Sequence, residues 1–343
     1  MTYDQIRPSV IIPVFNKPRE LENCLEALVK QNNSPAFEVI VVDDGSTENL
    51  SKVKEKFAAR LNLRWCKLEK NQGPAVARNA GIKMARGNVV VFTDSDCQPD
   101  LNWLKRMTAP FCDPEITGVK GSYKTRQVDT WAKLAQIEFE ERFDLLEQSL
   151  DIDFVDTYSG AFKRADLIKI GGFDTSFTKA DNEDVDLAFR IKLMGGHFVF
   201  VRDAFVEHKH REGFWNYFKL KFFRGFWRSK VYEKHPGKMG KESYTPNSLK
   251  MQLVLLLIFP FIFLFSSKKV KSIIHFIIFW LISCGNLLKV SFRFHRDVLY
   301  LVPVFAFFRG VALLGGLAWA EIISIRKKVV FKLNFVHRKL FGN

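Results

Sequence analysis

Short apolar runs alternate with amphipathic stretches through the first hundred residues of the chain. Strands are predicted at Val10–Val14, Val39–Val42, Leu63–Leu68 and Val89–Thr93, mostly because these segments are rich in β-branched residues and end in turn residues. Helices are predicted at Lys17–Gln31, from its leucine spacing, and at Pro74–Arg86, where proline suits the first turn. Buried strands alternating with helices indicate an α/β fold with a mostly parallel sheet and helices on both faces.

The pattern becomes mixed over residues 105–204. Helices are predicted at Trp131–Leu150 and from about Glu183 to Met194, and a strand is predicted at Phe198–Val201. The glycine pair in Gly171–Asp174 predicts a turn, and Ser159–Ala161 is expected in a loop.

Beyond residue 204 the chain becomes apolar and basic. Phe214–Tyr232 interleaves aromatic and basic side chains, which is typical of a helix in a lipid headgroup layer; a core helix of a soluble domain fits its first half equally well. Apolar runs at Met251–Phe265, Ile273–Leu288 and Val298–Ile325 predict membrane-associated helices before a basic tail. Because the first two runs are short, two crossings and one interfacial helix are expected, with a re-entrant hairpin as the alternative.

The net charge of +15 is unevenly distributed. Residues 1–204 have a balance of −3, and residues 205–343 one of +18. Because the basic residues flank apolar runs, they indicate a membrane surface and argue against a nucleic-acid partner. With 47% hydrophobic and 26% charged residues, the composition also excludes a disordered chain, a collagen and a coiled coil.

The five cysteines show no paired spacing, so reduced thiols are expected. The first residues have no cationic start followed by a long apolar run, which predicts that no signal peptide is cleaved and that the first domain lies in the cytoplasm.

Acidic residues collect where the predicted strands end, the edge at which sheets of this kind bind ligands. Asp94 and Asp96 follow a buried strand. In an extended segment, side chains two residues apart point the same way, so both acids are expected to face one hard cation such as Mg²⁺ or Mn²⁺ bound to a diphosphate. A solvated turn is the common alternative for this spacing.

Two further acidic clusters carry candidate chemistry. Asp43 and Asp44 end a strand and could accept from a nucleobase N–H or from ribose hydroxyls, although a helix cap is a strong alternative. Asn182–Asp186 opens a helix, whose dipole would keep one carboxylate ionised as a general base; the same acids could simply stabilise the helix end.

Together these motifs resemble family 2 of the glycosyltransferases, over roughly residues 8–212 and in that family's order. The matching segments are Val10–Asn16, Glu20, Asp43–Ser46, Asn71–Pro74, Ala77–Gly81, Asp94 with Asp96, Gly171–Asp174 and Glu183–Asp184. The resemblance implies the GT-A (Rossmann-like) fold and a nucleotide-sugar donor, with uracil as the expected base. It also implies a division of the chain into a catalytic domain at 1–212, with a nucleotide-binding half at 1–104 and an acceptor half at 105–212. An aromatic and basic helix with a linker would follow at 213–249, and membrane-associated helices with a basic tail at 250–343.

The resemblance further implies roles for individual residues. Asp184, with Glu183 beside it, would deprotonate the acceptor hydroxyl, and one displacement would invert the anomeric carbon. Asp96, Asp94 and His208 would hold Mn²⁺ or Mg²⁺, which would neutralise the leaving diphosphate. The nucleotide would be bound by Pro13, Val14, Phe15, Glu20, Asp43, Asp44, Arg78, Asp94 and Ser95. Arg78, His208 and Arg211 could contact phosphate, with a solvated polar loop as the alternative for each.

Three functions fit this resemblance. The first is transfer of a single sugar to a hydroxyl of a lipid-linked or growing glycan at the cytoplasmic membrane face, of the kind that builds bacterial or archaeal surface glycans. The second is transfer to a polyprenyl phosphate, whose nucleophile is already anionic. The third is a non-catalytic scaffold that binds sugar nucleotides. The Gln-x-x-Arg-Trp pattern of processive polymerases is missing, with only a faint echo at Arg224–Arg228, which favours single-sugar addition.

Overall fold

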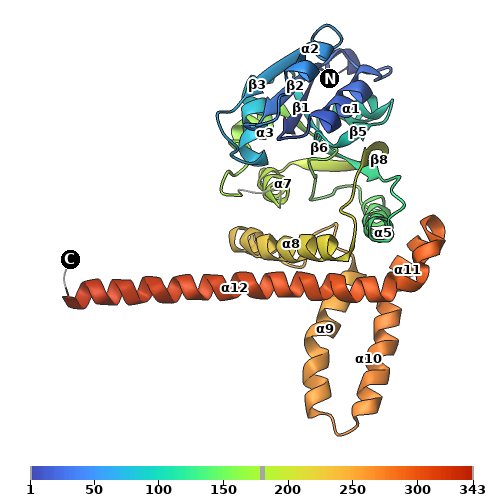
Figure 1. Ribbon diagram of the computed structural model, residues 1–343, viewed down its shortest axis with the longest axis vertical. Coiled ribbons are helices and arrows are strands. Elements are labelled where there is room, and N and C mark those ends of the chain that lie inside the picture. The colour runs from blue at the N-terminus through green and yellow to red at the C-terminus, as the bar shows by residue number, and fades with distance from the viewer. Residues whose placement is uncertain (1, 178–181, 342–343) are drawn as a thin grey trace. The chain divides into compact units, whose positions relative to one another are not determined.

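The computed structural model describes residues 2–177 and 182–341, with side chains in the last helix described up to Arg326 (Figure 1). The chain forms two compact units. The first comprises Met1–Arg211 and Glu242–Pro246, and the second comprises Glu212–Lys241 and Asn247–Asn343.

In its described residues, the first unit is built on one sheet of eight strands in the order β3-β2-β1-β4-β7-β6-β8-β5. The strands are β1 (Pro8–Val14), β2 (Glu38–Asp43), β3 (Leu63–Lys67), β4 (Val89–Phe92), β5 (Cys97–Pro99), β6 (Ile116–Lys124), β7 (Gly160–Lys163) and β8 (His197–His208). The helices are α1 (Pro18–Val29), α2 (Ser51–Ala58), α3 (Pro74–Met84), α4 (Trp103–Thr108), α5 (Thr130–Leu146), α6 (Arg164–Lys169) and α7 (Glu183–Leu193), with 3₁₀ turns at Tyr3–Gln5 and Ala109–Cys112.

The N-terminal half of the sheet confirms the α/β prediction. Strands β3, β2, β1 and β4 are parallel neighbours, at the positions that the apolar runs predict. β2 and β4 are buried at every residue, whereas β3 is only partly buried because it lies at the edge of the sheet. Continuous apolar runs therefore mark the strands that are covered on both faces.

The other half of the sheet is mixed. β7 pairs antiparallel with both β4 and β6, β6 runs parallel to β8, and β5 pairs antiparallel with β8. Because Gly160 begins β7, the expectation of a loop at Ser159–Ala161 is wrong. Glycines interrupt the apolar pattern of this half of the sheet, because neighbouring groups approach the backbone too closely for a side chain. A Cβ on Gly118 would lie 2.6 Å from the Phe198 ring, and one on Gly121 would lie 2.2 Å from the Ala204 carbonyl oxygen.

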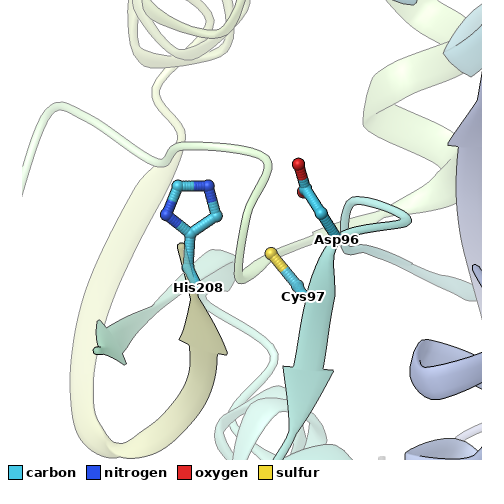
Figure 2. A group of neighbouring side chains, drawn as sticks. All are labelled: Asp96, Cys97 and His208. Atoms are coloured by element: carbon cyan, nitrogen blue, oxygen red, sulfur yellow. The ribbon is translucent and has the colours of Figure 1, made fainter. Parts of the chain in front are cut away.

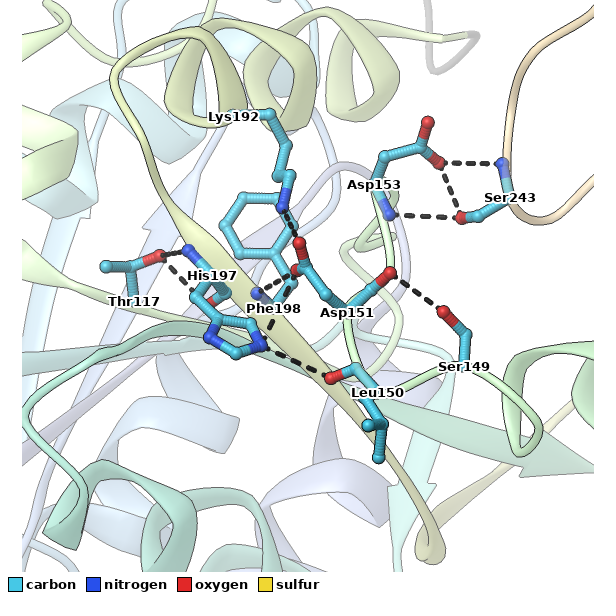
Figure 3. Close-up of polar contacts among 9 residues, drawn as sticks. All are labelled: Thr117, Ser149, Leu150, Asp151, Asp153, Lys192, His197, Phe198 and Ser243. Carbon is cyan, nitrogen blue, oxygen red and sulfur yellow. Dashed lines mark hydrogen bonds and ion pairs between the residues drawn. The ribbon is translucent and has the colours of Figure 1, made fainter.

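A short segment of the predicted linker belongs to the first unit. Ser243 donates to Asp153 Oδ1 through both its amide nitrogen, at 3.0 Å, and its hydroxyl, at 2.6 Å, and the hydroxyl accepts from the Asp153 amide at 3.1 Å (Figure 3). The Tyr244 ring lies 4.3 Å from that of Phe154. The predicted range 213–249 therefore contributes to both units, while the predicted division at residue 104 stays a prediction.

The second unit is helical. Its helices are α8 (Phe214–Lys234), α9 (Asn247–Phe265), α10 (Lys269–Ser283), α11 (Gly285–Phe294) and α12 (Val302–Phe341), with 3₁₀ turns at Pro236–Lys238 and Arg296–Leu301. Within the described residues, the helices at Asn247–Phe265 and Arg296–Arg326 are long and apolar enough to cross a membrane. The helices α10 and α11 are bent by 48° relative to each other, and they would add a third span if together they form a single span.

Several polar residues inside these apolar helices are paired with polar groups of neighbouring helices. Arg309 of α12 is buried and donates to Gln252 Oε1 of α9 at 2.7 Å. Gln252 in turn donates to the Ser283 carbonyl at the end of α10, at 3.1 Å. Ser229 of α8 donates to Glu321 of α12 at 3.0 Å. These bonds satisfy polar groups that would be costly among apolar side chains.

Candidate active site

The carboxyl ends of β1 and β2 are joined by hydrogen bonds. Asn16 adopts a left-handed conformation (φ +52°), and its Oδ1 accepts from the amides of Thr47 and Glu48 at 2.9 and 3.1 Å. The Asn16 amide donates to Ser46 Oγ at 3.0 Å, and the Ser46 amide donates to Asp43 Oδ1 at 2.8 Å. Asp43 is thereby fixed at the rim of the sheet, beside the end of β1.

Asp44 joins this turn to the segment before α3. Its two carboxylate oxygens accept from the amides of Gln72 and Gly73, each at 2.9 Å. Gly45 adopts φ +72°, and a Cβ there would lie 2.4 Å from the carbonyl carbon of Lys70. Burial raises the pKa of Asp44, and the two amide bonds oppose that rise. Asp44 thus holds two motifs together, and its role in nucleotide binding stays a prediction.

The acids that follow β4 lie in a turn. The Cys97 amide donates to the Asp94 carbonyl at 3.0 Å, so the expected extended geometry is wrong, and the two carboxylates reach different partners. Asp94 Oδ1 accepts from Arg78 at 2.8 Å, whereas Asp96 Oδ2 accepts from Lys17 Nζ at 2.6 Å. Ser95, between them, is buried.

His208 lies beside Asp96, as Figure 2 shows. β5 begins directly after the turn, and its pairing with β8 sets Cys97 opposite His208. The donor atoms of Asp96, Cys97 and His208 all lie within 4.8 Å of one another. This set combines a carboxylate oxygen, which suits Mn²⁺, with an imidazole nitrogen and a thiol, which suit softer metals. Sequence reasoning missed Cys97, whose only signal was its position next to Asp96.

The electrostatics of the turn keep Asp96 ionised. Burial by itself would raise the pKa of Asp96, but His208 and Lys17 outweigh it and hold that pKa below its ordinary value. At Asp94 burial dominates and raises the pKa, although Arg78 opposes it. Burial also raises the pKa of the Cys97 thiol. Asp96 is therefore ionised and, with its side chain 25% exposed, accessible to a divalent ion.

Two consecutive residues of α3 connect distant parts of the first unit. Arg78 donates to Glu183 Oε1 at 2.7 Å and to Asp94 at 2.8 Å, with only 2% of its surface exposed. Asn79 donates to the Phe173 carbonyl and accepts from the Phe173 amide, both at 2.8 Å. α3 thereby links the turn after β4 to the start of α7.

Asp184 lies in the first turn of α7 and is partly exposed. Its pKa is raised to about 7, chiefly by burial and then by the nearby carboxylates of Glu183 and Asp156. Lys192, near the other end of the helix, is paired with Asp151 (Figure 3). A carboxylate with a pKa near neutrality, on a fixed helix, can act as a general base.

The remaining predicted residues lie at or near the same rim. Val14 is buried at the end of β1, Pro13 is half-buried, and Phe15 is 41% exposed. Glu20 and Arg211 are exposed, Glu20 in the first turn of α1 and Arg211 shortly after β8. Lys17 is a site residue that sequence reasoning missed, because its partner Asp96 is 79 residues away.

One series of contacts between neighbouring residues connects four of the predicted acids, namely Asp43, Asp94, Asp96 and Asp184. Asp43 bonds to Ser46, which bonds to Asn16; the next residue, Lys17, pairs with Asp96. Asp94, in the same turn as Asp96, pairs with Arg78, which also holds Glu183, the neighbour of Asp184. The predicted motifs thus meet at one edge of the sheet.

Comparison with known proteins identifies the family of the domain that carries these residues. Residues 9–171 match the family model described as glycosyl transferase family 2. This chain carries a family 2 glycosyltransferase domain. It is 37% identical over 206 residues to the glycosyltransferase AglE of Haloferax volcanii, across 55% of this chain and 66% of that protein. It is 27% identical over 246 residues to the pre-mycofactocin glycosyltransferase of Mycobacterium tuberculosis, across 67% of this chain and 48% of that protein.

The fold also resembles that of a solved mannosyltransferase. The mannosyltransferase PcManGT from Pyrobaculum calidifontis, in complex with GDP-Man and Mn²⁺, matches with a TM-score of 0.62 at 19% sequence identity. The match covers 93% of this chain and 88% of that protein. It confirms the GT-A fold predicted for this family 2 domain.

Proposed function

We propose that this protein transfers a single sugar from a nucleotide-sugar, with UDP as the expected carrier, to a hydroxyl of a lipid-linked or growing glycan. The reaction inverts the anomeric carbon, depends on a divalent metal and takes place at the cytoplasmic face of the cell membrane. The observation that carries this proposal is the chain of contacts that brings Asp43, Asp96 and Asp184 to one edge of the sheet.

The donor nucleotide binds at the ends of β1 and β2. Asp43 is fixed there through Ser46, with its Oδ2 3.8 Å from Lys67 Nζ, and can accept from a nucleobase N–H. The exposed ring of Phe15 and the half-buried Pro13 offer apolar surface to the base. The similar solved structure of the mannosyltransferase PcManGT is a complex with GDP-Man, so the identity of the base requires a direct test.

Asp96 and His208 would hold the metal, with Asp94 as the neighbouring acid. The carboxylate donor of Asp96 suits Mn²⁺ or Mg²⁺, and its lowered pKa keeps it ionised for this purpose. A bound ion of this kind supplies positive charge that neutralises a leaving diphosphate. Lys17 lies beside Asp96 and adds positive charge at the same place.

Asp184 removes the proton from the acceptor hydroxyl. Its pKa of about 7 matches the operating pH of a general base, and a hydroxyl nucleophile needs such a base. A phosphate nucleophile is already anionic, so the raised pKa of Asp184 favours a hydroxyl acceptor over a polyprenyl phosphate. The apolar helices of the second unit would keep the enzyme at the membrane, where a lipid-linked acceptor is found.

The test is donor hydrolysis by the whole protein in detergent, over a panel of UDP-, GDP- and dTDP-sugars with Mn²⁺ or Mg²⁺. Hydrolysis of at least one donor is expected, together with its loss on addition of EDTA and in Asp96→Ala. Asp184→Asn should reduce transfer to a hydroxyl acceptor by about 10²–10⁴-fold. UDP binding should survive in that variant, because Asp184 takes no part in holding the nucleotide.

Three results would contradict the proposal. Binding of UDP without turnover of any donor would favour a non-catalytic scaffold. Normal turnover of Asp184→Asn on a hydroxyl acceptor would reject the assignment of the base. Efficient transfer by that variant to a polyprenyl phosphate, with none to hydroxyls by the unchanged protein, would favour the lipid-phosphate synthase.

A further inference from the structure

Arg78 occupies an unusual position for a charged residue. It is 2% exposed, and its two terminal nitrogens reach carboxylates from different parts of the chain. One nitrogen lies 2.8 Å from Asp94, 16 residues on, and the other lies 2.7 Å from Glu183, 105 residues on. The Phe173 ring lies 5.7 Å from the guanidinium carbon and covers it on one side.

This geometry leaves Arg78 little freedom to bind a substrate. Both terminal nitrogens are engaged by carboxylates, and the remaining Nε is buried without a hydrogen-bond partner among the described residues. A buried ion pair is costly to break, because the partner that remains is an uncompensated charge. To contact a phosphate, the Arg78 side chain would have to leave one of these carboxylates. The two ion pairs therefore hold Arg78 in place.

Glu183 is equally constrained. It is buried, and its carboxylate accepts from Arg78 at the first residue of α7. Asp184 is the next residue and is partly exposed. Because the bond to Arg78 fixes Glu183, it also fixes the direction in which the first turn of α7 presents Asp184.

We propose that Arg78 is a positioning residue that connects the metal-binding turn to the helix carrying the base, with Glu183 as its anchor. Arg78 then fixes the distance between the donor, bound beside Asp94 and Asp96, and the base Asp184. Glu183 takes no proton from the acceptor. This inference rests on the proposed function and assigns to Arg78 and Glu183 a task different from nucleotide binding and catalysis.

A double-mutant cycle tests the connection. Arg78→Gln and Glu183→Gln should each lower the kcat of donor hydrolysis by about 10²-fold, the loss expected when a reacting group is displaced by about 1 Å. The double variant should be no slower than the worse single variant, because the two residues act as one unit. The Kd for UDP with Mn²⁺ and the donor KM should change by less than the kcat.

Arg78→Lys separates position from charge. An ammonium group keeps the charge but lacks the planar fork that holds two carboxylates at fixed positions. The kcat should therefore stay low in Arg78→Lys. Recovery of the kcat in this variant would overturn the proposal, because charge alone would then suffice.

The ion pair between Arg190 and Asp186 provides a matched control on the same helix. Its atoms lie 2.8 Å apart, and Asp186 is buried. Arg190→Gln should lower the melting temperature with little change in kcat. If Arg78→Gln does not fold, Glu183→Gln, which keeps the size of the side chain, supplies the measurement.

Two results would overturn the proposal while leaving the proposed function intact. In the first, the unchanged protein hydrolyses a donor, and the fold-loss in kcat of the double variant equals the product of the losses of the two single variants. The second is a loss of UDP affinity in Arg78→Gln as large as its loss of kcat, which would make Arg78 a nucleotide contact. If the unchanged protein turns over no donor at all, the proposed function fails instead.

Discussion

Neighbouring acids in this protein have different properties because their surroundings differ. Asp96 has a lowered pKa beside His208 and Lys17, although burial opposes the shift, whereas burial raises the pKa of Asp184 to about 7. The first can hold a cation, and the second can exchange a proton near neutral pH. Residue type alone does not distinguish them.

The pKa of Asp184 predicts the pH dependence of the reaction. A base works only when ionised, so kcat should rise with pH up to about 7 and fall about tenfold for each unit below it. A pH–rate profile of donor hydrolysis checks this. An acid limb centred near pH 4 would contradict it.

The same shift predicts an effect on stability. The folded protein binds this proton more tightly than the unfolded chain does. The resulting stabilisation is fully present below about pH 4 and is lost as the pH rises from there through about 7. Asp184→Asn should therefore melt higher than the unchanged protein at pH 8, a gain that also shows that the inactive variant is folded.

At the scale of elements, the turns between strands and helices hold the site together. The turn after β2 and the segment before α3 meet through Asp44, which accepts from two backbone amides. The close approach of Gly45 to Lys70 leaves no room for a side chain. The motifs Asp43–Ser46 and Asn71–Pro74 are thus one structural feature, although 24 residues separate Ser46 from Asn71.

Asp44→Ala should therefore act on stability. It leaves the partly buried amide of Gln72 and the buried amide of Gly73 without their acceptor, which should lower the free energy of unfolding by about 1–3 kcal/mol. Chemical denaturation measures this change, with Glu48→Ala as an exposed acid in the same turn for comparison. Unchanged stability with weaker UDP binding would instead make Asp44 a nucleotide contact.

At the scale of the whole molecule, a family 2 domain is joined to a helical unit with the properties of membrane helices. Among the residues that the structure describes, two helices of that unit are apolar over lengths sufficient for a span, and their polar residues Gln252, Glu321 and Arg309 are paired within the unit. The basic charge beyond residue 204 accompanies these helices.

Attachment through apolar spans predicts how the protein fractionates. It should stay with membranes in high salt and in alkaline carbonate and be released by detergent, because salt screens charge but does not weaken apolar burial. Release by salt alone would indicate a surface held by basic residues. Tags at both ends report the number of crossings: two spans place the ends on the same side, and three place them on opposite sides.

The sequence by itself determined the α/β class, the parallel strands β1 to β4 and the family 2 domain, because apolar runs and turn motifs are local properties of the chain. It also predicted His208 as a metal ligand, and that role stays a prediction. Only the tertiary structure decided that Asp94–Cys97 is a turn, that β7 is a strand, and that Lys17 and Cys97 lie beside Asp96. The strand β7 and the ion pairs of Lys17 with Asp96 and of Arg78 with Glu183 depend on partners tens of residues away, and no local pattern records such partners. The turn at Asp94–Cys97 is closed by a local hydrogen bond, which the spacing of the two acids does not reveal.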